Sequence, residues 1–197
     1  MSLHLIALDC PACGSAMSGG GSDVIFFCSH CGSAALLEPD GLEVMESSAL
    51  LPSPGHHARF WKPAWIIEAE VRVDERVRHG GRRSEGWRGE KTFVVPAFRL
   101  PLVDLVMLAR ALSEASGTVG EVPREPIQGG TLAYEDALVL ARHIVVGDEV
   151  REPDNLASVD VEMTATSHRL AAIPFEDPGD GRLKCAITGV VVSPAAD

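Results

Sequence analysis

The chain has 197 residues, of which 17 are basic and 28 are acidic, so its formal net charge is −11 at pH 7. Hydrophobic residues make up 46% and charged residues 23%, a balance that is typical of a folded protein and excludes general disorder. The length suits one ordinary domain plus one small domain. Its apolar runs are far shorter than the ~18 residues that a membrane helix needs. The acidic excess also disfavours a protein whose whole surface binds nucleic acid.

Four of the five cysteines form two closely spaced pairs near the N-terminus. Cys10 and Cys13 make the first pair, Cys28 and Cys31 make the second, and 14 residues separate the two pairs. A C-x2-C turn places two thiolates on one side of a tight loop, so two such turns supply the four ligands of a tetrahedral metal site. A glycine follows the second cysteine of each pair and permits the left-handed backbone that such a turn needs. The spacing therefore predicts one metal site made by these four cysteines.

The two cysteine turns resemble those of the zinc-ribbon family, and the resemblance covers residues 5–37. It implies that β-hairpins carry the turns, with strands at residues 23–27 and 34–37 and a glycine-rich tip at residues 19–21. It also implies a single structural Zn²⁺, because four protein ligands leave no coordination position for water or substrate.

Two other interpretations of the cysteines remain open. The same residues could form two disulfides, although a cytoplasmic chain with a fifth cysteine disfavours them. An iron site of rubredoxin type uses similar turns, but the short spacer and the missing aromatic core favour zinc. We expect His30, inside the second turn, to be solvated rather than a ligand. We expect Cys185, in an apolar segment, to be a small core residue.

Strands are expected on both sides of a linker that follows the ribbon. A short strand is predicted at residues 42–45, and the prolines and glycine of residues 47–57 predict the linker. Alternating apolar residues predict a strand over residues 65–73, and a second apolar run at residues 92–95 stops at Pro96.

Two helices and three further strands are predicted after that. Pro101 opens the first helix and Gly117 ends it, whereas the second runs from residue 133 to 146 with Gly147 as its stop. A strand at residues 159–163 precedes a hairpin made by residues 169–175 and 183–192. The residues expected to face the core at helical spacing are Leu102, Leu105, Val106, Ala109 and Leu112 in the first helix, and Tyr134, Leu138, Ala141 and Val145 in the second.

The grouping of strands and helices predicts an α+β fold, in which zinc-ribbon β-hairpins precede a mainly antiparallel sheet with about two helices. We expect a zinc ribbon over residues 1–38, a short strand and linker over 39–58, and an α+β domain over 59–197. A ribbon followed by the Phe60–Pro63 and Pro96–Phe98 motifs is also similar to uncharacterised prokaryotic proteins that join an N-terminal zinc ribbon to a β-rich domain. That resemblance implies no activity.

Residues 72–91 form the one basic stretch, with seven Lys or Arg residues against four acidic ones. Arginines interleaved with glycines and an aromatic residue are a composition that binds phosphate backbones and stacks on bases. The candidate nucleic-acid contacts are Arg76, Arg78, Arg82, Arg83, Trp87 and Arg88. The competing interpretation is a long, mobile hairpin loop that is charged because it is solvated.

Other candidate sites are weaker. The pairs Glu68 with Glu70 and Asp160 with Glu162 share strand faces and could act as acid and base or bind a cation, but such positions are usually the solvated face. The adjacent residues 56–57 are both histidines, but a second metal site is a weak hypothesis because no third ligand lies nearby in the sequence. Nucleotide-binding, zinc-protease and serine-hydrolase motifs are absent from the sequence.

We therefore expect a zinc-binding, non-enzymatic interaction or assembly protein with a protein partner and no membrane association. Nucleic-acid binding through the ribbon and residues 72–91 is the alternative. In the interaction hypothesis, the ribbon would present residues 24–27 to a partner or to the chain's own second domain. The N-terminal residues lack a basic stretch followed by an apolar one, so we expect an uncleaved cytoplasmic protein.

Overall fold

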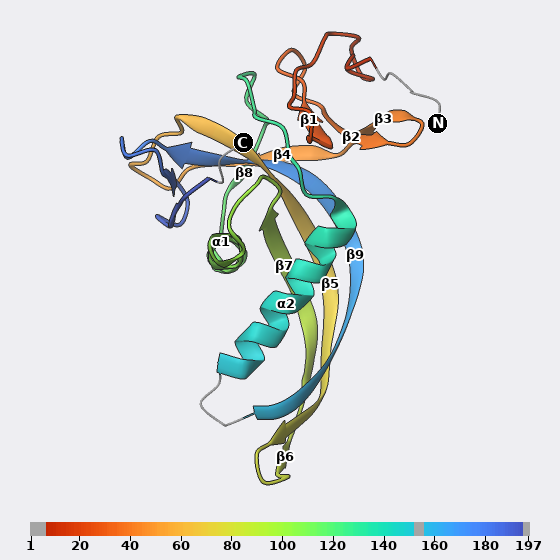
Figure 1. Ribbon diagram of the computed structural model, residues 1–197, viewed down its shortest axis with the longest axis vertical. Helices are drawn as coiled ribbons and strands as arrows, with labels where there is room; N and C mark the ends of the chain where they lie inside the picture. Colours follow the sequence, from red (N-terminus) through yellow and green to blue (C-terminus); the bar gives the residue numbers. More distant parts are fainter. Residues whose placement is uncertain (1–6, 152–155, 195–197) are drawn as a thin grey trace.

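The computed structural model of the protein describes residues 7–151 and 156–194. These residues form an α+β fold with two helices, a three-stranded sheet and an eight-stranded sheet (Figure 1). The predicted fold class is therefore confirmed. Residues 1–6 of the predicted ribbon, and residues 152–155 and 195–197 of the predicted α+β domain, lie outside the described residues.

The second half of the predicted ribbon and the short strand after it form the three-stranded antiparallel sheet. Strand β1 (Ile25–Phe27) pairs with β2 (Ala34–Glu38), and β2 pairs with β3 (Gly41–Met45). These strands lie where the sequence predicts strands into and out of the second cysteine turn and a short strand after it. Figure 1 shows this sheet at one end of the molecule, away from the tip of the long hairpin at the other end.

Three long strands dominate the larger sheet. The central strand β5 (Phe60–Arg78) pairs antiparallel with β7 (Trp87–Pro96) on one side and with β9 (Leu156–Glu176) on the other. The segments 159–163 and 169–175, predicted as separate strands, are both parts of β9. The alternation of apolar and polar residues is interrupted between these two segments, because the pairing of β5 with β9 has a bulge where β9 faces Glu68 and Ala69.

The basic stretch is a paired hairpin and not the long mobile loop of the competing interpretation. Strand β5 continues through it to Arg78, β6 (Arg83–Ser84) pairs with β5, and β7 begins at Trp87. Gly80 and Gly81 supply the turn, with φ angles of 94° and 79° that favour glycine. The alternating Val71 and Val73 keep β5 extended because they are buried under α2.

Short strands complete the larger sheet. Strand β4 (Ser47–Leu50), expected to be part of a linker, pairs in parallel with β9 and antiparallel with β8 (Val119–Gly120). Burial of Ala49 and Leu50 explains why these residues join the sheet. The predicted strand 183–192 is two strands, β10 (Leu183–Cys185) and β11 (Val191–Val192), separated by a tight turn.

Helices α1 (Leu102–Glu114) and α2 (Tyr134–Arg151) lie close to the two predicted positions. Helix α1 buries Leu105, Leu108, Ala109 and Leu112, whereas Leu102, expected inside, is 64% exposed because the first turn extends beyond the core. Helix α2 buries Ala137, Ala141, Ile144, Val145 and Glu149, whereas Tyr134 and Leu138 are half-buried at the margin of the core.

Helix α2 also passes through Gly147, which the sequence suggested as its end. Its last turn is held by tertiary ion pairs, because Asp148 meets Arg110 of α1 and Glu149 meets Arg76 of β5. These contacts offset the low helix propensity of glycine.

The long strands separate two apolar clusters. Trp65 and Ile67 of β5 point into one cluster, which they share with α2 and with Ile25 of the ribbon. Ile66 points into the other, which it shares with Leu108 of α1 and with β10 and β11. The boundary between ribbon and second domain near residue 58 stays a prediction. In the described part of the chain, neither helix is long and apolar enough to cross a membrane.

Candidate metal centre and neighbouring sites

The four predicted ligands come together at the end of the ribbon. The Sγ atoms of Cys10 and Cys31 lie 3.7 Å apart, those of Cys13 and Cys28 also lie 3.7 Å apart, and all four lie within 4.8 Å of one another. A tetrahedral zinc ion with Zn–S bonds of about 2.3 Å places its sulfurs about 3.8 Å apart. The donor set and its spacing therefore fit one tetrahedral metal ion. None of the five cysteines forms a disulfide.

The same backbone turn presents both cysteine pairs. In the first turn, the amide of Cys10 donates to the carbonyl of Ser15 and the amide of Gly14 donates to the carbonyl of Cys10, both at 2.8 Å. In the second turn, Cys28 donates to Ser33 at 2.9 Å and Gly32 donates to Cys28 at 2.8 Å. The two glycines have φ angles of 74° and 82°, as the sequence predicts. Each of these knuckles (residues 10–15 and 28–33) therefore places its two cysteines on one tight turn.

The two cysteines of a knuckle have different surroundings. Cys10 and Cys28 are buried, Cys13 is exposed and Cys31 is half-buried. Burial raises the pKa of Cys10 to about 12, whereas the hydroxyl of Ser33 lowers the pKa of Cys31 to about 6. The corresponding Ser15 lowers the pKa of Cys13. A bound cation supplies the positive charge that a buried thiolate at Cys10 needs.

The apolar strand beside the metal centre packs inside the chain itself. Ile25, Phe26 and Phe27 are buried, and Ile25 and Phe27 belong to the same cluster as Trp65. Gly130 accepts hydrogen bonds from the amides of Val24 and Ile25 and donates one to the carbonyl of Ile25. Of the two expectations for these residues, a partner or the chain itself, the structure shows packing against β5, α2 and Gly130 of the same chain.

A third knuckle occurs at the C-terminal end, and sequence reasoning missed it. The amide of Cys185 donates to the carbonyl of Val190 and the amide of Gly189 donates to the carbonyl of Cys185, both at 2.8 Å. Gly189 has a φ of 74°, like the glycines of the metal-binding knuckles. The sequence signal for this knuckle is that Cys185, Thr188 and Gly189 have the spacing of Cys-x-x-Cys-Gly in the two metal-binding turns. Threonine takes the place of the second cysteine. This third knuckle (residues 185–190) packs against Ser53, whose hydroxyl donates to the carbonyl of Ile187 at 2.9 Å.

Two of the six candidate nucleic-acid contacts point into the molecule. Nε1 of Trp87 donates to Oε1 of Glu149 at 2.7 Å, and Nε of Arg76 lies 2.6 Å from Oε2 of the same carboxylate. These contacts fasten the hairpin to α2. The other four candidates lie nearer the tip or on the outer face of the hairpin, with Arg78 half-buried and Arg82, Arg83 and Arg88 exposed. Arg83 forms an ion pair with Glu75 at 3.3 Å.

The acidic pairs do not converge on a site. Glu68 accepts from the hydroxyl of Ser167 at 2.8 Å and from Arg169 at 3.0 Å, and these contacts lower its pKa. Asp160 and Glu162 are exposed on β9. Among the described residues, the four ribbon cysteines are the one group of three or more His, Cys, Asp or Glu side chains close enough together to hold a metal ion.

The remaining candidates to be placed are the histidines and the fifth cysteine. Nδ1 of His56 lies 2.8 Å from Oε1 of Glu176, and the ring of His168 stacks on Tyr134 with the centroids 4.0 Å apart. His30 is exposed, as expected of a solvated residue, and Cys185 is buried in the second apolar cluster, as expected of a small core residue.

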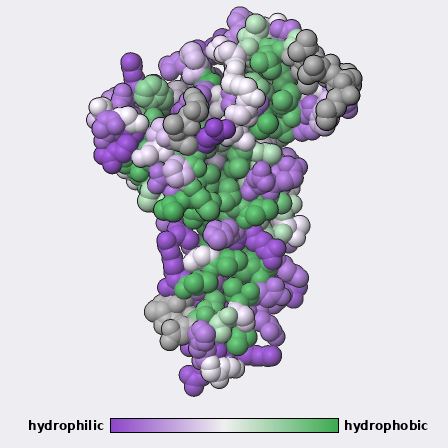
Figure 2. Space-filling view, viewed as in Figure 1, coloured by the Kyte–Doolittle hydropathy of each residue, from purple (hydrophilic) through white to green (hydrophobic). Residues whose placement is uncertain are grey.

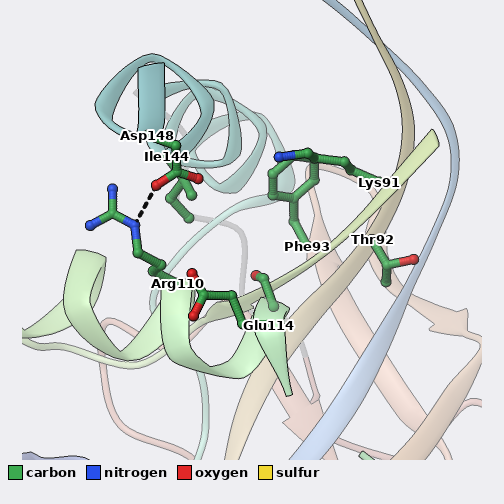
Figure 3. A pocket seen from close by; sticks show the side chains of 8 residues that line it. Lys91, Thr92, Phe93, Arg110, Glu114, Ile144 and Asp148 are labelled. Atoms are coloured by element: carbon green, nitrogen blue, oxygen red, sulfur yellow. Dashed lines mark ion pairs between the residues drawn. The ribbon is translucent and has the colours of Figure 1, made fainter. Parts of the chain in front are cut away.

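A small pocket of about 190 Å³ lies between α1, α2 and β7 (Figure 3). Figure 3 shows Arg110 of α1 and Asp148 of α2 reaching toward each other, and their Nε and Oδ1 atoms lie 2.7 Å apart. Lys91 and Glu114 also line this pocket. Cations and carboxylates balance one another in it, so the pocket has no clear charge preference.

Comparison with known proteins found no matching family model, no matching curated protein and no matching solved structure. The likeness to zinc ribbons rests on the four sulfurs and on the two knuckles that present them.

Proposed function

We propose that this protein binds one structural zinc ion through its ribbon and serves, without catalysis of its own, as a cytoplasmic interaction or assembly module for a protein partner. The observation that carries the proposal is the set of four sulfurs at tetrahedral spacing, on two knuckles with the same backbone hydrogen bonds. Four sulfur ligands complete the coordination of zinc, so the ion would hold the ribbon together instead of activating water.

Zinc is preferred to iron as the resident ion. Rubredoxin-type iron would use the same sulfurs at nearly the same distances, so geometry alone favours neither metal. In the sequence, the short spacer and the missing aromatic core favour zinc. Elemental analysis of the purified full chain should give one zinc per chain and no stoichiometric iron. Stoichiometric iron, or no metal at all, would contradict the proposal.

Matched cysteine variants separate metal binding from a general loss of folding. Cys28→Ser removes one of the four sulfurs and should abolish stoichiometric zinc. Cys185→Ala removes the buried cysteine outside the ribbon and should leave one zinc per chain. Loss of zinc in both variants would argue against a site made by the ribbon alone.

The exposed face of the two helices supports a protein partner. Figure 2 shows apolar residues gathered over the part of the surface where α1 and α2 lie. The exposed apolar side chains include Val103 and Met107 of α1, with Val103 78% exposed, and Val139 and Val150 of α2. Contiguous exposed apolar surface is typical of interaction sites.

Charged substitutions on α1 test this surface. A Val103→Glu, Met107→Glu double variant should lose any partner that co-purifies with the wild type, whereas Glu135→Lys, at an exposed polar position of α2, should keep it. Retention of the same partner by the double variant would exclude this face as the interaction surface.

Nucleic-acid binding remains the alternative proposal. The exposed Arg82, Arg83 and Arg88 support it, whereas the first 58 residues, which include the ribbon, contain no Lys or Arg. Titration of labelled single- and double-stranded oligonucleotides at low and high salt tests it. Phosphate contacts would weaken steeply as salt rises, and the absence of binding at low salt would exclude the alternative.

A further inference from the structure

A cleft of about 850 Å³ lies where the tip of the ribbon meets the second domain. The ribbon contributes the glycine-rich loop of residues 19–21 together with Ser22 and Asp23. The second domain contributes Lys62 from β5, Arg99 from the segment after β7, and Gln128. Clefts of 300 to 1,000 Å³ are of the size that takes a cofactor or another small molecule.

The cleft holds two cations in a chain whose net charge is −11. Lys62 and Arg99 stand beside a ribbon that itself has no Lys or Arg. Nζ of Lys62 lies 5.4 Å from the centre of the Phe98 ring and contacts Oε1 of Gln128, so the ammonium is held at the cleft. Nη2 of Arg99 donates to the hydroxyl of Ser22 at 3.5 Å, which places the guanidinium against the ribbon loop.

Among the described residues that line the cleft, Asp23 carries the one carboxylate, and it is bound to the loop. Oδ2 of Asp23 accepts a hydrogen bond from the amide of Gly20 at 2.6 Å, and the amide of Asp23 donates one to the carbonyl of Gly20 at 3.1 Å. A Cβ atom at Gly21 would have open space around it, so the loop leaves room for a ligand to approach its backbone. Ser18 and Thr131, whose side chains carry hydroxyl groups, also line the cleft.

We propose that this cleft binds a phosphate-bearing small molecule of about nucleotide size. Lys62 and Arg99 would neutralise the phosphate oxygens, since charge-assisted hydrogen bonds are the strong ones in such sites. Pro126, Ile127 and Phe98 would pack against the apolar part of the ligand. A small ligand fits better than a nucleic acid, because the long-range field of an acidic protein repels a polyanion.

Calorimetric titration of the metal-loaded full chain with ADP and with inorganic pyrophosphate tests the proposal. Saturable one-to-one binding of ADP is expected, with weaker binding of pyrophosphate because it lacks the apolar part. Lys62→Gln and Arg99→Gln should each weaken ADP binding about tenfold or more. Arg142→Gln, which removes an exposed cation of α2 that does not line the cleft, should leave binding unchanged. Amide resonances of Gly19, Gly20 and Gly21 should shift on addition of ADP.

Three results would overturn the proposal. The first is no saturable binding of either probe by the folded full chain. The second is equal ADP binding by the wild type and both cleft variants. The third is that a short single-stranded oligonucleotide displaces ADP at a concentration below the one at which ADP half-saturates the protein. That result would identify a nucleic-acid surface. None of these results depends on whether the zinc or protein-partner proposals hold.

Discussion

The indole Nε1 of Trp87 donates a 2.7 Å hydrogen bond to Oε1 of Glu149, which joins the first residue of β7 to the last turn of α2. The other oxygen of Glu149 pairs with Arg76 of β5, and the side chains of Arg76 and Glu149 are only 11% and 10% exposed. One carboxylate therefore fastens both strands of the hairpin to the helix. Arg76 and Trp87, candidate nucleic-acid contacts in the sequence, have this structural role in the fold.

Removal of this carboxylate should destabilise the protein strongly. Glu149→Ala removes the carboxylate that lies 2.6 Å from the buried Arg76 guanidinium and that accepts from the Trp87 indole. We expect a loss of about 3 kcal/mol in the free energy of unfolding, as for other broken buried ion pairs. Urea denaturation followed by tryptophan fluorescence measures it.

Glu162→Ala is the matched control for that prediction. Glu162 also faces an arginine, Arg72, at 3.6 Å, but its side chain is 65% exposed. An exposed pair contributes about 0 to 1 kcal/mol, so this variant should unfold almost like the wild type. Similar losses in both variants would show that Glu149 has no special role.

The ribbon should depend on Gly130 for its attachment to the second domain. A Cβ atom at Gly130 would lie 2.9 Å from the carbonyl oxygen of Ala97 and 3.0 Å from Cβ of Ile25, so Gly130→Ala forces the segment at Gly130 away from these two residues. We expect a loss of about 2 kcal/mol, in the range of overpacked cores. Denaturation curves measure the loss, and zinc content should stay at one per chain because no ligand is touched.

Gly21→Ala is the control for the general effect of replacing a glycine by alanine where no clash occurs. A Cβ atom at Gly21 meets nothing within 4 Å and its φ is not in the left-handed region, so the change should stay within about 0.5 kcal/mol. Wild-type stability of the Gly130→Ala variant would mean that the ribbon is held elsewhere.

Features that depend on near neighbours in the chain could be predicted from the sequence. The cysteine spacing and the following glycines predict both knuckles, because ligand geometry and backbone conformation are set within six residues. The alternation from residue 65 to 73 predicts the centre of β5, because both strand faces repeat every second residue.

Features that depend on distant contacts could not be predicted in this way. Helix α2 continues past Gly147 because Arg110 and Arg76, from other elements, bind its last turn. Strand β4 looks like a linker because its partners, β9 and β8, both come from distant parts of the chain. The cleft beside Lys62 joins segments far apart in the sequence, so no local pattern marks it.

The third knuckle should depend on its glycine for backbone reasons alone. Gly189 has a φ of 74°, and a Cβ atom there would meet nothing within 4 Å. Gly189→Ala should therefore cost about 1 to 2 kcal/mol through the left-handed conformation and not through a clash. Thermal and urea unfolding measure this cost, and zinc content should not change.

Two further variants isolate the cause of that loss. Gly189→Asn should recover part of the stability, because asparagine tolerates the left-handed region. Gly89→Ala, in β7, also adds a Cβ atom with nothing within 4 Å but has no positive φ, so no loss is expected. An equal loss in the two alanine variants would exclude backbone strain as the explanation.

The carboxylate of Glu176 should make part of the stability depend on pH. Nζ of Lys184 donates to Oε2 at 2.9 Å and His56 lies against Oε1, and these contacts lower the pKa of Glu176 from 4.5 to about 2. Because the folded pKa is below the unfolded one, the contribution is fully present above pH 4.5 and is lost as the pH falls toward 2. Glu176→Gln should lower the melting temperature by a few degrees at pH 7. Its difference from the wild type should shrink as the pH falls through this window.

Glu121→Gln is the control for the change in net charge, because Glu121 is exposed. Melting curves of both variants and the wild type are compared from pH 7 to pH 2.5. Loss of metal as the cysteines become protonated affects all three proteins alike, so the difference between Glu176→Gln and the wild type isolates the carboxylate. A difference that stays constant down to pH 2.5 would contradict the lowered pKa. No difference at pH 7 would show that the contacts with Lys184 and His56 contribute nothing to stability.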